Sequence, residues 1–230
     1  MDYSLGFLLM AGAAAFLVGA SKGGLPMVGA LGVPLLALVM SPVAAAALLL
    51  PVYILSDWVG LWAYRHQFSK RNLAILIPAM IFGVGVGWAT AKITPEWMVT
   101  LLVGVVGLYC CATVVFRKAN APPHRADIPR GLFWGTLTGF TSFVSHTGGP
   151  PFQTYVLPQK LPKMVFAGTS TIAFAIINVV KLVPYWALGQ FNPGNLEMAA
   201  ILSPVAIIGA VTALGTKLTT TFGSVSAKLR

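Results

Sequence analysis

Charged residues are scarce in this chain, and acidic residues are the scarcest. Of 230 residues, 15 are lysine or arginine, 5 are aspartate or glutamate, and all charged residues together make up only 9%. A soluble domain carries charge on roughly a quarter of its residues. The composition therefore excludes an ordinary soluble domain, and the few carboxylates argue against a di-metal site.

Cysteine pairs and nucleotide-binding motifs are missing as well. The two cysteines, Cys110 and Cys111, are adjacent in an apolar run, so they cannot readily bridge and have no metal-ligand spacing. No P-loop is present, which argues against ATP hydrolysis, and the three histidines form no ligand cluster. We therefore expect no enzyme activity, no cofactor and no metal.

Long apolar runs dominate the chain instead. Hydrophobic residues make up 57% of it, and the mean hydropathy is +0.83. A helix needs about 20 mostly apolar residues to cross the hydrocarbon core of a bilayer. The candidate segments are 3–20, 25–40, 44–64, 72–92, 97–116, 131–145, 150–159, 164–187 and 196–217. We predict an all-α fold, a polytopic transmembrane helical bundle forming a single domain over residues 1–230.

Basic residues lie in short clusters between these runs, a pattern that predicts orientation in the cell inner membrane rather than nucleic-acid binding. With the N-terminus in the periplasm, nearly every lysine and arginine in a connecting loop faces the cytoplasm. Only Lys92 faces out, beside acidic residues, whereas Lys22 and Lys181 lie within or near the membrane. The C-terminus of this chain is then expected on the cytoplasmic side.

The two halves of the sequence echo each other at a spacing near 125 residues. The stretch 19–26 resembles 141–150, 67–73 resembles 190–196, and 77–83 resembles 203–209. We predict an inverted repeat of about 5+4 segments, as is common in secondary transporters. Repeat one covers about 1–117, a cytoplasmic loop covers 117–130, and repeat two covers about 131–230 and is expected to lack its last helix.

Each half has a polar, glycine-rich turn after its first segment, and we expect broken or re-entrant helices there. Such turns point backbone N–H groups at a ligand, and a following helix adds its positive end. Lys22 adds a full charge, and His146 can change protonation near neutral pH. An ordinary pair of loops is the alternative. The candidate anion-binding residues are Ser21, Lys22, Gly23, Gly24, Ser145, His146, Thr147, Gly148 and Gly149.

Further polar residues interrupt apolar segments. A carboxylate inside the membrane is costly, so Asp57 is expected to have a specific role. It is either a proton carrier or a structural partner of Lys22 or Lys181. His146 is the second candidate proton carrier. Lys181 itself lines the site or extends to the membrane surface. The polar stripe near the start of segment 164–187 lines the site or makes interhelical hydrogen bonds. This stripe adds the candidate binding residues Thr169, Ser170, Thr171 and Asn178, and Gln153 is a further candidate after the second turn.

These motifs resemble the sulfite exporter TauE/SafE family, also called the 4-toluene sulfonate uptake permease family. The resemblance rests on the turn 21–24, on residues 145–151, and most strongly on Ala167-Gly-Thr-Ser-Thr171 after the basic loop 160–163. It extends over nearly the whole chain. It implies transport of sulfite, sulfonates, sulfoacetate or similar anions across the cytoplasmic membrane.

Together these features favour a secondary transporter for a small sulfur or carboxylate anion, coupled to protons and working by alternating access. A passive anion channel and a non-transporting membrane partner of a sulfur-metabolism enzyme are the alternatives. The expected partners are the anion and the lipid bilayer; a homodimer is left open, and no nucleic acid is expected.

Overall fold

A computed structural model describes residues 4–22, 26–95 and 123–228 and isolated positions between 97 and 112. All of the regular structure in these residues is helical. The helices are α1 (Leu5–Ser21), α2 (Pro26–Gly29), α3 (Gly32–Leu36), α4 (Pro42–Tyr64), α5 (Lys70–Thr90), α7 (Ile128–Ser145), α8 (Gly149–Val156), α9 (Lys163–Ala187) and α10 (Pro193–Lys228), with a short 3-10 turn, η1 (Leu157–Gln159). The predicted all-α class is confirmed.

Four of these helices are long and apolar enough to cross a membrane: α4, α5, α9 and the part of α10 from Pro193 to Thr216. The apolar helix α1 is shorter, with 17 residues. These helices match five of the predicted segments within a few residues. The predicted segment 97–116 lies largely outside the described residues.

Polar side chains set several of the helix starts. The Ser41 hydroxyl accepts a hydrogen bond from the backbone N–H of Ala44, and Pro42 follows it at the first position of α4. Asp127 accepts from the backbone N–H of Arg130 at the start of α7. Such caps satisfy N–H groups that the first helical turn leaves unpaired.

Two of the shorter predicted segments, 25–40 and 150–159, do not form single spanning helices. Segment 25–40 forms α2 and α3, which are separated at residues 30–31. Segment 150–159 forms α8 and then η1. Neither piece has the length to cross a bilayer, so each returns toward the side from which its preceding helix came. The second segment of each half is therefore a half-length hairpin arm.

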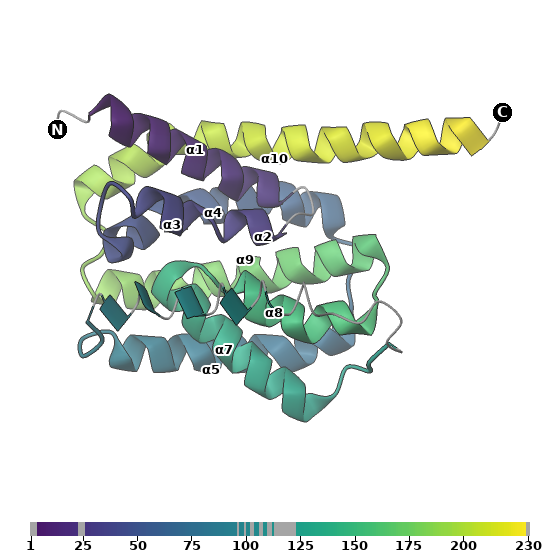
Figure 1. Ribbon diagram of the computed structural model, residues 1–230, viewed down its shortest axis with the longest axis horizontal. Coiled ribbons are helices and arrows are strands. Elements are labelled where there is room, and N and C mark those ends of the chain that lie inside the picture. The colour runs from purple at the N-terminus through teal and green to yellow at the C-terminus, as the bar shows by residue number, and fades with distance from the viewer. Residues whose placement is uncertain are drawn as a thin grey trace.

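Helices α4 and α9 pack against each other at the centre, with α1 and α10 along one edge and α5 and α7 along the opposite edge (Figure 1). Helix α10 crosses α1 at very short range. A Cβ atom on Gly19 would overlap the carbonyl oxygen of Ala206, and one on Gly209 would lie 2.6 Å from the carbonyl oxygen of Phe16. Only glycine lets these two backbones touch.

The opposite edge repeats this packing. A Cβ atom on Gly139 of α7 would overlap the carbonyl oxygen of Met80, and one on Gly83 of α5 would overlap that of Thr136. In both pairs, two contacts three residues apart join the first predicted segment of one half to the fourth predicted segment of the other half. This shared arrangement is what the proposed inverted repeat would produce.

Candidate functional site

Described residues of both polar turns lie around one cavity, close to where α2 contacts α8. The cavity has a volume of about 40 Å³. Its walls come from both halves of the chain, from α1, α4, α7 and α9 as well as from both hairpin arms. The lining residues are Ser21, Lys22, Gly29, Ala30, Tyr53, Ser142, His146, Gly149, Ser170, Thr171, Phe174 and Asn178.

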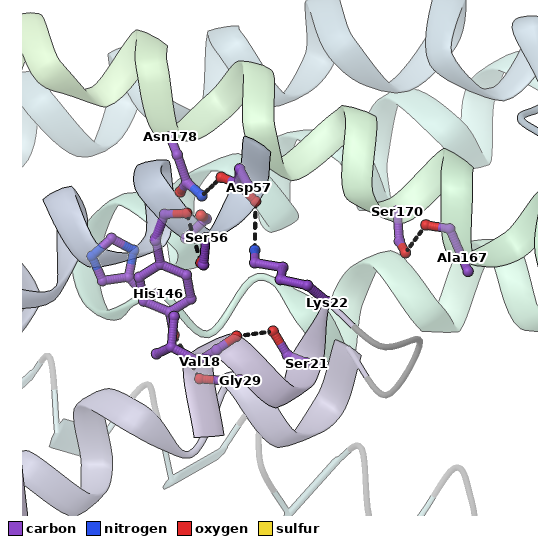
Figure 2. Close-up of polar contacts among 12 residues, drawn as sticks. Val18, Ser21, Lys22, Gly29, Ser56, Asp57, His146, Ala167, Ser170 and Asn178 are labelled. Carbon is purple, nitrogen blue, oxygen red and sulfur yellow. Dashed lines mark hydrogen bonds and ion pairs between the residues drawn. The ribbon is translucent and has the colours of Figure 1, made fainter. Parts of the chain in front are cut away.

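Lys22 is the C-cap of α1, at the start of the first turn, and is buried, with only 6% of its surface exposed. Its Nζ lies 2.6 Å from Oδ1 of Asp57 on α4, and the side chain of Asn178 on α9 donates to Oδ2 of the same carboxylate at 2.8 Å. Figure 2 shows the lysine and the asparagine approaching Asp57 from two sides. The carboxylate therefore links α1, α4 and α9.

Small residues make room for this ion pair. A Cβ atom on Gly60 would lie 2.8 Å from the Thr171 methyl group and 3.6 Å from Cβ of Lys22. The Tyr53 hydroxyl donates to the Gly29 carbonyl oxygen at 2.6 Å, and Nζ of Lys22 lies 5.3 Å from the centre of the Tyr53 ring. The tyrosine thus fixes the first hairpin arm and supplies a second, weaker partner for the lysine.

His146 ends α7 in the left-handed conformation, with φ of 54°. This backbone conformation turns the chain sharply and points the imidazole into the bundle. Its Nε2 lies 2.9 Å from the carbonyl oxygen of Ala46, and its Nδ1 lies 2.6 Å from Nζ of Lys181. Because a carbonyl oxygen only accepts, Nε2 carries the proton and Nδ1 accepts from the lysine. The imidazole in this arrangement is neutral.

Lys181 is fully buried on α9 and does not extend to the membrane surface. Besides Nδ1 of His146, its Nζ donates to the carbonyl oxygen and the hydroxyl of Ser142, at 3.1 and 3.2 Å. Three acceptors suit an ammonium group with three protons. Lys181 forms no ion pair with a carboxylate in the described part of the chain.

The buried lysines around the cavity outnumber the buried carboxylates in the described residues. Asp57 is paired with Lys22, whereas Lys181 has no carboxylate partner there. A protonated Lys181 would be very costly so far from water unless an anion compensated it. An anion bound in the cavity could do so.

Many of the predicted site residues come together as expected. Lys22, His146, Gly149, Ser170, Thr171, Asn178 and Ser21 line the cavity, and Asp57 and Lys181 bond to residues that line it. Gly23 and Gly24 lie outside the described residues. In Figure 2, Ser21 and Ser170 hydrogen-bond to carbonyl groups of their own helices, those of Val18 and Ala167.

Other predicted residues lie beside the cavity but not in its wall. The hydroxyls of Ser145 and Thr147 bond to each other at 2.8 Å and stabilise the second turn. Thr169 accepts from the backbone N–H of Ser69, so it ties α9 to the loop before α5. Gly148 is the residue before α8, and Gln153 is buried on α8 with its Nε2 unpartnered.

Three prominent lining residues were missed from the sequence. Tyr53 lies one turn before Asp57, and Ser142 lies one turn before His146. Phe174 falls between Thr171 and Asn178 at helical spacing. The rule that residues three or four apart share a helix face would have indicated all three. A metal is not indicated, because no group of three or more His, Cys, Asp or Glu clusters in the described residues.

The sequence was also compared with models of known protein families. The family model described as sulfite exporter TauE/SafE matches residues 9–228. The chain belongs to the sulfite exporter TauE/SafE family. Neither the curated proteins nor the solved structures include a match. Family membership and the four long apolar helices together make this a multi-pass membrane protein of a transporter family.

Proposed function

We propose that the chain is a proton-coupled secondary transporter that moves a small anion across the bacterial inner membrane. The candidate substrates are sulfite, an organosulfonate or a related sulfur or carboxylate anion. The observation that carries the proposal is the cavity between residues of the two polar turns, which Lys22 lines while paired with Asp57, and behind whose His146 a second lysine, Lys181, is buried. Membership of the sulfite exporter TauE/SafE family supports the substrate class.

The first turn supplies a cation that can change partners. Lys22 lines the cavity and is paired with Asp57 at 2.6 Å. An anion entering the cavity competes with Asp57 for this lysine. If Asp57 takes up a proton, it releases Lys22 to the anion, so proton and anion bind together.

His146 is the less suitable proton carrier of the two candidates. A second proton on its imidazole would have to sit on Nδ1, which lies 2.6 Å from the Lys181 ammonium. Two positive groups at that distance repel strongly in a buried site. We therefore assign proton coupling to Asp57, and a fixed electrostatic role to the Lys181–His146 pair.

Alternating access fits the proposed inverted repeat. Both hairpin arms reach the cavity, and the α1–α10 and α5–α7 pairs pack in the same manner on opposite edges. Rocking of one half against the other would open the cavity to one side at a time. The cytoplasmic location of the C-terminus remains part of this proposal.

The direct test is uptake of radiolabelled sulfite into proteoliposomes under a pH gradient. We expect accumulation against the sulfite gradient, and loss of it in Lys22→Ala. Lys92→Ala, which removes an exposed lysine, is the matched control and should transport normally. Full accumulation by Lys22→Ala would refute the site.

The alternatives give different results in the same vesicles. A passive channel would equilibrate sulfite without accumulating it, and a non-transporting partner of an enzyme would give no flux. Because Lys22→Ala leaves Asp57 unpaired, the double variant Lys22→Gln/Asp57→Asn serves as a second test. It removes both charges together and should fold but not accumulate sulfite.

A further inference from the structure

The cavity is small compared with many of the anions that the family resemblance allows. It has a volume of about 40 Å³. A single buried water needs a cavity of at least about 10–15 Å³, so this cavity has room for a small ligand of a few atoms. Sulfite, with one sulfur and three oxygen atoms, is close to that size. A sulfonate on an aromatic ring is far larger.

One wall of the cavity is an aromatic ring without polar atoms. Phe174 lies on α9 on the same face as Thr171 and Asn178, and all three line the cavity. The same cavity is lined by the polar side chains of Lys22 and His146. An oxoanion would turn its oxygens toward these polar groups. A carbon tail on its sulfur would then extend toward Phe174.

The Phe174 ring packs against the start of the second hairpin arm. Its centre lies 5.4 Å from that of Phe152, a fully buried side chain of α8. A Cβ atom on Gly148, the N-cap of the same helix, would lie 3.0 Å from Cε1 of Phe174, so the second turn packs directly on the ring. A close-packed side chain of this kind yields little to a larger ligand.

We propose that Phe174 sets the upper size limit of the substrate, so that the chain selects small inorganic oxoanions such as sulfite over organosulfonates. This inference rests on the proposed function of the cavity and narrows it. Tyr53, the other large ring in the wall, is tied to Gly29 and close to Lys22, so it belongs to the polar side. Phe174 is the apolar boundary.

The test compares binding of sulfite, ethanesulfonate and benzenesulfonate to the purified full-length protein, by thermal shift and calorimetry. We expect the wild type to prefer sulfite over benzenesulfonate by at least about tenfold, since a single methylene in a close-fitting pocket is worth about 10–200-fold. Phe174→Ala should lower this ratio by about tenfold or more through tighter binding of benzenesulfonate.

Phe166→Ala is the matched control. Phe166 lies on the same helix, and its ring also packs on Phe152, at 6.3 Å, but it does not line the cavity. This variant should leave the sulfite-to-benzenesulfonate ratio unchanged. Phe174→Leu is a milder second variant, with an intermediate ratio expected, in case the alanine variant does not fold.

The outcomes separate this inference from the proposed function. Equal binding of sulfite and benzenesulfonate by the wild type would overturn the size limit and leave anion binding intact. A ratio unchanged in both Phe174 variants, or lowered equally by Phe166→Ala, would also overturn it. If none of the three anions binds to the wild type, the proposed function itself fails.

Discussion

The two polar turns occupy corresponding places in the two halves, yet they bring different electrostatics to the cavity. At the first turn, Lys22 is compensated by Asp57 at 2.6 Å. At the second, neutral His146 accepts from Lys181, which has only uncharged partners. The first turn thus holds an ion pair, whereas the second contacts a buried lysine without a carboxylate partner, to which we have assigned the role of a fixed cation.

This difference separates two tasks that a single symmetric site could not perform. A fixed cation attracts anions at all times but cannot couple their binding to a proton. An ion pair can be opened by a proton but attracts an anion weakly while it is closed. The cavity lies between the two, and mutations at either turn should therefore fail in different ways.

The largest effect on stability is expected at the first turn. Lys22→Met leaves the Asp57 carboxylate buried without its cation, and breaking a buried pair costs about 3–5 kcal/mol of the free energy of unfolding. Lys22→Met/Asp57→Leu should recover most of this loss, because no charge is left unpaired. Unfolding in mixed micelles by sodium dodecyl sulfate measures both variants. A double variant no more stable than the single one would contradict the comparison.

At the second turn, the loss of a lysine should destabilise the fold less. Lys181→Met leaves no opposite charge unpaired, only the acceptors on His146 and Ser142, so we expect a cost of about 1–3 kcal/mol. Sulfite binding should nevertheless weaken by about tenfold or more, since the site loses a buried group that can carry a positive charge toward the anion. Unfolding and calorimetry on the same protein separate the two effects. Unchanged sulfite affinity would show that Lys181 is structural only.

The helices that lead into the two turns, α1 and α7, should lose similar amounts of stability when their close-contact glycines are replaced. Gly19→Ala and Gly139→Ala each place a Cβ atom on a carbonyl oxygen of the crossing helix, which should cost about 1–3 kcal/mol of stability. Gly12→Ala and Gly85→Ala are the matched controls, since nothing lies within 4 Å of a Cβ atom there. Unequal losses at Gly19 and Gly139 would weaken the case for a repeat.

Local patterns were enough to predict the spans and the two turns. Long apolar runs predict spanning helices wherever they occur, and α4, α5 and α9 agree with the predicted segments within a few residues. The glycines and polar residues of the turns mark breaks because they interrupt those runs. The extra length of α10 was missed, since polar residues after 217 end the apolar run but not the helix.

The site was only partly predictable, because its key contacts join residues far apart in the sequence. Asp57 was expected to pair with Lys22 or Lys181, and only the packing of α1 against α4 selects Lys22. The contact between Lys181 and His146 depends on a left-handed residue that no apolar pattern reveals. Phe174 looks like any core residue until the cavity beside it is known.

The smallest expected effect, a change in the pH dependence of sulfite binding, tests the coupling directly. Asp57→Asn imitates the protonated carboxylate, so Lys22 stays available to the anion at every pH. If Asp57 is the proton carrier that we propose, sulfite affinity should rise as pH falls in the wild type but not in Asp57→Asn. One pH unit across the membrane is worth about 1.4 kcal/mol, or about tenfold accumulation for one coupled proton.

Proteoliposomes carrying Asp57→Asn should therefore still exchange labelled for unlabelled sulfite, but a pH gradient should no longer drive accumulation. Asp127→Asn is the matched control, because the same change at the N-cap of α7 keeps a good capping residue outside the cavity. Continued pH-driven accumulation by Asp57→Asn would assign the proton to another group. The ion pair at the first turn would then not take part in coupling, and the functional contrast between the two turns would disappear.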